Sequence, residues 1–153
     1  MTAESLRAKL ASLVGKTILS IGRVHYVLAR TTESDRGPIE LTFSDSSIAL
    51  FDVGPDGEAL RLEEARWRDP FDEPLSSVNR DFVEKSGKWT AFDVSGEPPY
   101  VALIGQTVLD VQPILTEGGK ITGTAVTTHA GTIRVRTYGA DDVFVTVAKS
   151  EPP

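Results

Sequence analysis

Short apolar segments separated by turn residues fill most of this sequence and constrain its fold most strongly. Residues 39–44 alternate apolar and polar side chains, which is the period of a half-buried strand. The turn sequence Asp45-Ser46 leads from this strand to a second apolar segment at 48–53. The turn sequence Pro55-Asp56-Gly57 leads on to a third at 59–62. These three segments predict an antiparallel meander.

One short helix is expected before the strands. Thr2 can cap its start, and Leu6, Leu10 and Leu13 follow at spacings of four and three, which places them on one helix face. Gly15 can then adopt the left-handed conformation that ends a helix. We expect the three leucines to pack on the sheet, because no other element offers this helix an apolar partner.

Residues 63–97 interrupt the succession of strands. Leu75, Val78 and Phe82 recur there at helical spacing, which predicts a short helix that ends at Gly87. A strand is expected after it at 88–94, where Trp89 is interpreted as a core residue. Other predicted elements are a strand at 17–28 with a bulge or bend at Gly22, and one helical turn that begins at Pro98-Pro99.

The segment Leu13–Ile21 resembles Leu103–Val111. Four of the nine positions are identical, and three more exchange Val with Ile. This predicts an internal duplication with half-repeats at 13–62 and 103–147 and an insertion at 63–97. The alternative is a chance resemblance between two segments that are rich in Val and Ile.

The length of 153 residues suits a single domain, 1–153. Eight or nine short strands imply a mainly β (α+β) fold, an antiparallel β-sandwich or barrel-like sheet with an N-terminal amphipathic helix.

There is no cysteine, which excludes disulfides and thiolate metal sites and suits a reducing compartment. No apolar run approaches the roughly 18 residues of a membrane span. Glu4, Lys9 and Lys16 interrupt any signal-peptide core, so we expect a complete, cytoplasmic chain.

The acidic charge is concentrated in the middle of the chain. The net charge is −6, but residues 33–97 contain 16 acidic and 7 basic residues, a net charge of −9, and the remainder carries +3. An acidic chain is not expected to bind nucleic acid, since nucleic-acid binders carry a basic surface. The acidic region is interpreted either as a solvated surface or as a face for a basic protein partner.

One segment partly matches a calcium-binding loop. Asp52, Asp56, Gly57 and Glu63 occupy the first, fifth, sixth and twelfth positions of an EF-hand loop. The third position is Gly54, which has no side-chain oxygen, and strands are expected on both sides. The segment is therefore interpreted as a plain hairpin turn.

Nothing in the sequence requires a metal or a cofactor. His25 and His129 are isolated in the sequence, whereas a histidine-based metal site usually combines several ligands. The adjacent carboxylates Glu63-Glu64 and Asp141-Asp142 do not form a convincing acid–base pair. We expect the protein to fold without a metal ion or cofactor.

The segment 66–74 is the candidate binding site. It places aromatic residues among charges and prolines, a composition favoured at protein-binding hot spots. The alternative is that its aromatic side chains enter the core and fix a crossover loop. The candidate partner-binding residues are Trp67, Asp69, Phe71, Asp72 and Glu73.

These features predict a non-catalytic protein that presents an acidic face to a basic protein, as an immunity or inhibitor-type protein does. One alternative is a small-molecule-binding β-barrel or an enzyme, with His25 or converging carboxylates in the cavity of the sheet. Another is an assembly subunit with an apolar self-association patch. No catalytic residue is assigned, and the oligomeric state is left open.

Overall fold

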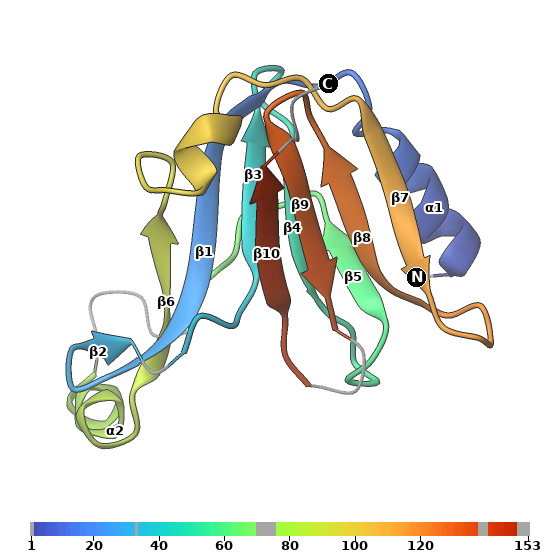
Figure 1. Cartoon of the computed structure of the whole chain (residues 1–153). Coiled ribbons are helices and arrows are strands. Elements are labelled where there is room, and N and C mark those ends of the chain that lie inside the picture. Colours follow the sequence, from blue (N-terminus) through green and yellow to red (C-terminus); the bar gives the residue numbers. More distant parts are fainter. Residues whose placement is uncertain (1, 33, 70–75, 138–140, 150–153) are drawn as a thin grey trace.

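The computed structural model describes residues 2–32, 34–69, 76–137 and 141–149, which form two antiparallel sheets packed face to face (Figure 1). The first sheet has the order β2-β1-β3-β4-β5, and β6 pairs with the other edge of β1. Its strands are β1 (Ile18–Leu28), β2 (Thr31–Thr32), β3 (Ile39–Phe43), β4 (Ile48–Val53), β5 (Leu60–Glu63) and β6 (Lys88–Asp93). The mainly β class with an N-terminal helix is confirmed, and the arrangement is a sandwich.

The second sheet follows the chain in the order β7-β8-β9-β10, with every neighbouring pair antiparallel. Its strands are β7 (Asp110–Leu115), β8 (Ile121–Thr127), β9 (Gly131–Arg136) and β10 (Phe144–Lys149). The helices are α1 (Ala3–Ala11), α2 (Ser77–Ser86) and the 3₁₀ turn η1 (Tyr100–Leu103). None of the helices in the described ranges is long and apolar enough to cross a membrane.

The two similar sequence segments pair with each other where the sheets meet. The Gly15 amide donates to the Val108 carbonyl at 2.8 Å, and the Gly105 amide donates to the Ile18 carbonyl at 2.7 Å. A second reciprocal pair runs from Ile18 N to Gln106 O at 2.9 Å and from Val108 N to Lys16 O at 2.8 Å. The two bonds of each pair are related by the same shift of 90 residues. Gly15 in one segment corresponds to Gly105 in the other, and Ile18 corresponds to Val108.

Thr17 and Thr107 lie opposite each other at the centre of this junction. Their hydroxyl oxygens are 3.3 Å apart. In addition, each sheet contains a four-stranded meander in chain order, β1-β3-β4-β5 and β7-β8-β9-β10. These observations support the internal duplication, which stays a prediction that a superposition of the two halves would test.

The core lies between the sheets and under α1. Leu6, Leu10 and Leu13 are buried, as the sequence predicts, and α1 packs against β7 and β5. The Thr2 hydroxyl accepts the Ser5 amide at 3.0 Å, which confirms the helix cap. Strand residues that point inward from both sheets complete the core, among them Ile18, Ile21, Phe43, Phe51, Val126, Ile133 and Val135.

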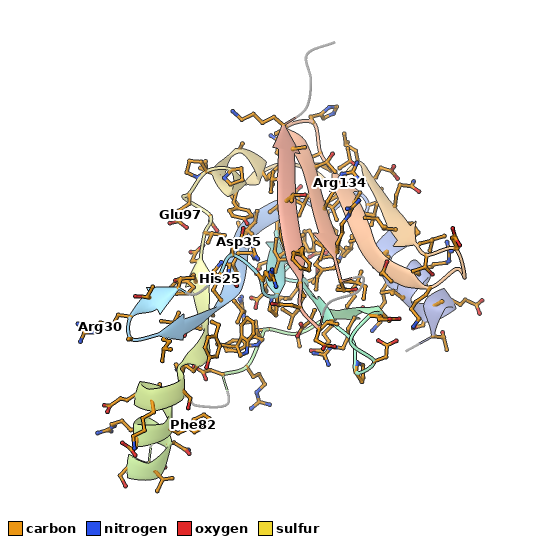
Figure 2. All side chains as sticks on the ribbon, turned by 60° about the horizontal axis from the view of Figure 1, so that its bottom comes forward. His25, Arg30, Asp35, Phe82, Glu97 and Arg134 are labelled. Atoms are coloured by element: carbon orange, nitrogen blue, oxygen red, sulfur yellow. The ribbon has the colours of Figure 1, made fainter. Side chains whose placement is uncertain are left out.

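The predicted α2 forms, but its apolar side chains stay outside the core. Val78 is 76% exposed and Phe82 is 51% exposed. Figure 1 shows α2 at the start of β6, away from the second sheet. Figure 2 labels Phe82 on this helix. The helix therefore projects from the sandwich and does not cover it.

Two local predictions are wrong. Trp89 is 38% exposed and is not a core residue, because it lies with its partner Tyr26 on the face of the first sheet that points away from the second. The irregularity of β1 lies between Ile18 and Ser20, where the register with β3 shifts, and not at Gly22. The bulge therefore lies at the junction between the sheets, where the strand leaves its pairing with residues 105–108.

A buried arginine fastens the chain before β3 to β1. Arg23 is 2% exposed, and its guanidinium donates to the carbonyls of Asp35 at 2.7 Å and Gly37 at 3.1 Å. It also donates to the Pro38 carbonyl at 3.4 Å and to the Tyr100 hydroxyl at 2.7 Å. Since carbonyls buried without donors are costly, Arg23 fixes this segment in one conformation.

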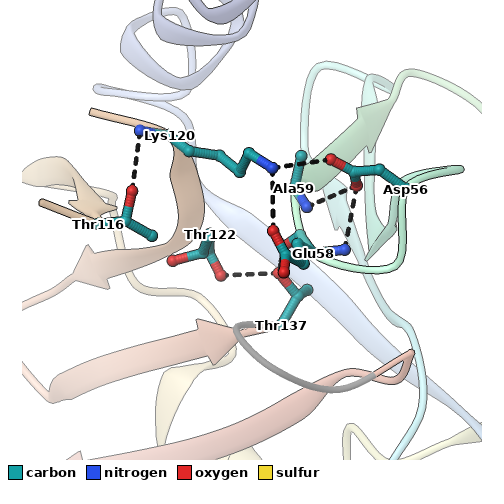
Figure 3. A network of polar contacts seen from close by, with 7 residues as sticks. All are labelled: Asp56, Glu58, Ala59, Thr116, Lys120, Thr122 and Thr137. Carbon is teal, nitrogen blue, oxygen red and sulfur yellow. Dashed lines mark hydrogen bonds and ion pairs between the residues drawn. The ribbon is translucent and has the colours of Figure 1, made fainter. Parts of the chain in front are cut away.

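A polar network joins the sheets at the opposite end from the junction (Figure 3). Lys120 Nζ lies 3.2 Å from Asp56 Oδ2 and 2.9 Å from Glu58 Oε2. The Thr137 hydroxyl contacts the carbonyls of Glu58 and Thr122. The turn between β4 and β5 is thus attached to the second sheet, and the hairpin interpretation of the calcium-like loop is confirmed.

The helix packing predicts a large cost for truncation of Leu10, whose side chain is 1% exposed. Leu10→Ala should lower the free energy of unfolding by about 2–5 kcal/mol, because it removes buried apolar contacts and leaves a cavity. Urea denaturation measures this change. The matched control is Leu19→Ala, since Leu19 is 58% exposed. An unchanged midpoint for Leu10→Ala would show that the helix does not stabilise the fold.

The hairpin turn predicts a loss of stability in acid. Backbone amides of Ala59 and Glu58, together with Lys120, lower the pKa of Asp56 from 3.8 to about 2. A carboxyl group with a lowered folded-state pKa stabilises the fold above its unfolded pKa and loses that effect as the pH falls through the folded one. The thermal midpoint should therefore drop between about pH 4 and pH 2.

Asp56→Asn should flatten the pH dependence of the thermal midpoint in this window. Asp110→Asn is the control, because the Asp110 carboxylate contacts only the Gln112 amide among the described residues. Identical acid profiles for the parent and for Asp56→Asn would contradict the assignment.

Candidate functional site

A cavity of about 580 Å³ opens beside α2, the helix at the lower left of Figure 1. We call it the aromatic pocket. Its described wall comes from β1, β4, β6, α2, the chain after β5 and the turn before β10. Four aromatic side chains contribute to this wall, Tyr26, Trp67, Phe82 and Trp89.

The pairing of β1 with β6 positions two of these rings. Tyr26 and Trp89 are cross-strand partners, so both side chains point away from the second sheet. Their ring centroids are 5.6 Å apart at an interplanar angle of 74°, an edge-to-face contact. This arrangement is a favourable one for aromatic pairs and holds both rings at the pocket wall.

Two glycines allow the backbone to approach these rings. Gly37 has φ +131°, and a β-carbon there would collide with the Val24 carbonyl and lie 3.0 Å from the Trp89 ring. Gly87 has φ +78°, and a β-carbon there would lie 2.5 Å from the Val27 carbonyl. Any side chain at either position would thus displace β1 or the rings of the pocket.

Trp67 is held by a carboxylate on the outer face of β3. The Trp67 amide donates to Glu40 Oε2 at 3.0 Å, and the Arg66 guanidinium donates to Glu40 Oε1 at 2.9 Å. Trp67 is half-buried in the pocket wall, so it is neither a core residue nor a freely exposed anchor.

Asp69, a predicted partner-binding residue, is engaged within the protein. Its Oδ2 atom lies 2.6 Å from Lys88 Nζ, and the two side chains are 20% and 24% exposed. Lys88 lines the aromatic pocket, and this ion pair holds its ammonium group. The predicted residues Phe71, Asp72 and Glu73 lie outside the described residues, so their part in the surface stays a prediction.

Three carboxylates line the pocket. Asp52 lies 3.1 Å from Arg61, and burial raises its pKa above 3.8, although the Val53 amide and Arg61 act in the opposite direction. Asp141 and Asp142 form no ion pair with any residue in the described ranges. The pocket therefore combines one carboxylate that is poorly solvated with two that are outside the ion pairs of the described residues. Arg68 and Lys88 also line it.

The histidine suggested for an alternative site lies elsewhere. His25 follows strand alternation and points to the opposite face of β1 from Tyr26. Its Nδ1 atom is 2.9 Å from the Arg36 carbonyl, and its ring centroid is 6.0 Å from that of Phe92. It is not among the described residues that line the aromatic pocket. Across the described ranges, no group of three or more histidines and carboxylates is arranged to hold a metal ion.

Sequence reasoning identified Trp67 but missed most of this pocket. Tyr26 and Trp89 were assigned to strands separately, and only the pairing of β1 with β6 brings them together. The sequence offers Asp141 and Asp142 as adjacent carboxylates that form no convincing acid–base pair, and it does not connect them with Trp67.

Comparisons with known proteins supply no family. No family model matches this chain, and no curated protein or solved structure matches it. The proposals below therefore depend on the chain's own geometry.

The anchoring role of Glu40 predicts a local change when it is removed. Glu40→Ala should lower the free energy of unfolding by about 1–3 kcal/mol, because the partly buried Trp67 amide and Arg66 lose their acceptor. Acrylamide quenching of tryptophan fluorescence should rise, since Trp67 is released. Glu64→Ala is the matched control, because Glu64 is an exposed acidic residue three positions before Trp67. Equal quenching in Glu40→Ala and in the parent would refute the anchoring role.

Proposed function

We propose that this chain is a non-catalytic binding protein that receives a cationic side chain of a basic protein partner in its aromatic pocket. The carrying observation is that four aromatic side chains and three aspartates line one cavity of about 580 Å³. An immunity or inhibitor-type protein that neutralises a basic protein is one such binder. A cytoplasmic location stays a prediction.

The aromatic side chains provide a surface suited to a cation. Lysine and arginine bind over aromatic faces, with Trp the best, and each contact contributes about 0.5–2 kcal/mol depending on desolvation. Tyr26, Trp67, Phe82 and Trp89 reach the pocket from four different segments. A side chain that enters would therefore contact several rings at once.

The carboxylates supply the complementary charge. Asp141 and Asp142 form no ion pair with any residue in the described ranges. The wall also contains Arg68 and Lys88, and the Lys88 ammonium group is paired with Asp69. Residues 33–97 as a whole carry a net charge of −9. Charges of this kind chiefly accelerate association with an oppositely charged partner and set its specificity.

A second candidate is a binder of a small organic cation, which the volume of the cavity favours. About 580 Å³ lies within the range of 300–1,000 Å³ that is typical of small-molecule sites. In that case a quaternary ammonium ion would bind on its own. The enzyme alternative called for His25 or converging carboxylates in a cavity. Asp52, Asp141 and Asp142 line this pocket, but Asp52 is paired with Arg61.

Tryptophan fluorescence provides a direct test. The chain has two tryptophans, Trp67 and Trp89, and both line the pocket. A hexa-arginine peptide should change the fluorescence in a stopped-flow experiment, with an association rate that falls as salt is added. A hexa-citrulline peptide of equal shape should not, because it lacks the charge.

Variants separate the pocket from general surface charge. The double variant Asp141→Asn, Asp142→Asn should slow association, and Trp89→Leu should speed dissociation through loss of a ring contact. Asp110→Asn is the control, because it removes one negative charge from an exposed residue that is not among those lining the pocket. The proposal would be overturned if hexa-arginine and hexa-citrulline bound equally. It would also be overturned if hexa-arginine bound equally to the parent and to the double variant. Binding of tetramethylammonium without binding of hexa-arginine would favour the small-cation candidate.

A further inference from the structure

One side of β6 has no partner strand. β6 lies at the margin of the first sheet and pairs with β1, and no other strand of the described ranges pairs with it (Figure 1). Its six residues contain no proline, and the pairing with β1 runs without a register shift. Trp89, Ala91, Phe92 and Asp93 are exposed. β6 therefore has the length and regularity to accept a further strand.

Other sheet edges are less suited to pairing. In the first sheet, β2 has two residues and β5 has four. In the second sheet, β7 contains Pro113, which has no amide to donate. The chain before β3 contacts the residue that precedes β10, since the Gly37 amide donates to the Val143 carbonyl at 2.9 Å. β6 is thus the longest edge strand of the first sheet and has no such obstruction within its six residues.

The pairing with β1 determines which backbone groups of β6 point outward. One step beyond the last register pair, the Val94 amide donates to the Ile21 carbonyl at 2.9 Å. Antiparallel pairs alternate between bonded and non-bonded, so the even-numbered residues of β6 bond to β1. Trp89, Ala91 and Asp93 therefore direct their amides and carbonyls away from β1, and no other backbone hydrogen bond in the described ranges engages them. We call these groups the open edge.

The residues of the open edge place their side chains on the face that holds the aromatic pocket. Trp89 lines the pocket beside its cross-strand partner Tyr26. Asp93 lies on the same face four residues further on, at about 13 Å along the strand. It forms no ion pair in the described ranges, and hydrogen bonds from the Ser95 side chain and amide lower the pKa of its carboxyl group below 3.8. An added strand would thus meet an aromatic ring and a negative charge.

These positions determine the segment that fits. A strand added antiparallel to β6 sets one residue opposite Trp89 and another opposite Asp93, with β-carbons about 5 Å apart in each pair. A basic side chain at the first place can cross the Trp89 ring toward the pocket, and one at the second can pair with the Asp93 carboxylate. The residues between them need only favour an extended backbone.

We infer that the partner of the aromatic pocket binds by adding an extended segment as an antiparallel strand to the open edge of β6. The segment carries basic side chains opposite Asp93 and Trp89, at its first and fifth positions, with β-branched residues between them. This inference rests on the proposed function for the occupant of the pocket and adds main-chain pairing to it. In such strand additions the main-chain bonds provide affinity and alternate side chains provide specificity.

Amide hydrogen exchange followed by ¹H–¹⁵N NMR tests the pairing. In the protein alone, the amides of Trp89, Ala91 and Asp93 should exchange faster than those of Thr90 and Phe92, which bond to β1. The probe is an acetylated and amidated peptide of sequence Arg-Val-Thr-Val-Arg. At saturation it should slow the exchange of the three outward amides by at least roughly tenfold, because they gain acceptors, and leave the other two unchanged.

Backbone methylation of the peptide separates main-chain pairing from side-chain contacts. In the antiparallel register the amide of the central threonine points toward β6, and the amides of the valines point away. N-methylation of the threonine should weaken binding by at least roughly tenfold, because it removes one bond and obstructs the approach. N-methylation of a valine is the matched control and should leave the affinity unchanged.

A proline variant tests the same contact from the protein side. Ala91→Pro removes one outward amide and keeps the pairing with β1, because an edge strand tolerates proline where the missing N–H faces outward. It should weaken peptide binding by at least roughly tenfold. Ala91→Val keeps the amide and should bind as the parent does. If Ala91→Pro does not fold, the methylated peptides still decide the question.

Several results would overturn the inference. Equal binding of the two methylated peptides would show that the main chains do not pair. Unchanged exchange at the open edge, with shifted indole signals, would place the peptide in the pocket alone and leave the proposed function standing, as would binding of hexa-arginine but not of this peptide. Slowed exchange that depends on protein concentration and not on peptide would identify pairing between two copies of this chain.

One further result would separate the two proposals in the opposite direction. A peptide with both arginines replaced by citrulline keeps the main chain and loses the charge. If it slowed exchange at the open edge and bound as tightly as the parent peptide, strand addition would be supported and the proposed cation site would be contradicted.

Discussion

The reciprocal pairing of residues 15–18 with residues 105–108 determines how the rest of the molecule is arranged. Four backbone hydrogen bonds around the Thr17–Thr107 pair join the start of one meander to the start of the other. Because β1 and β7 both leave this junction, the two sheets stack face to face and bury their apolar rows. The helix α1 then covers the end of the core beside β7 and β5.

This arrangement leaves part of the first sheet outside the sandwich. β1 is 11 residues long, and its second half pairs with β6 beyond the edge of the second sheet (Figure 1). Tyr26 and Trp89 lie on the face of the first sheet that points away from the second, where no other sheet covers them, so they line a pocket. The aromatic pocket is thus a surface that the packing of the sandwich leaves open.

Local patterns predicted the elements well, because helix caps and strand alternation act over a few residues. The leucines of α1, the β3–β5 meander and α2 all follow from such patterns. The pocket could not be predicted, because it depends on pairing between β1 and β6, which are separated by some 60 residues. For the same reason the sequence placed Trp89 in the core and gave no reason to connect Asp141 with Trp67. Charge counting found the acidic region but did not show that Asp69 is bound to Lys88.

The most direct test of the proposed function is a two-dimensional ¹H–¹⁵N NMR titration of the protein with hexa-arginine. The two indole N–H signals belong to Trp67 and Trp89. The account predicts that both signals shift together with the amides of Asp141 and Asp142, while those of Gly15, Ile18, Gly105 and Val108 at the junction stay in place. Unchanged indole signals at saturating peptide, with shifts confined to other surfaces, would contradict it.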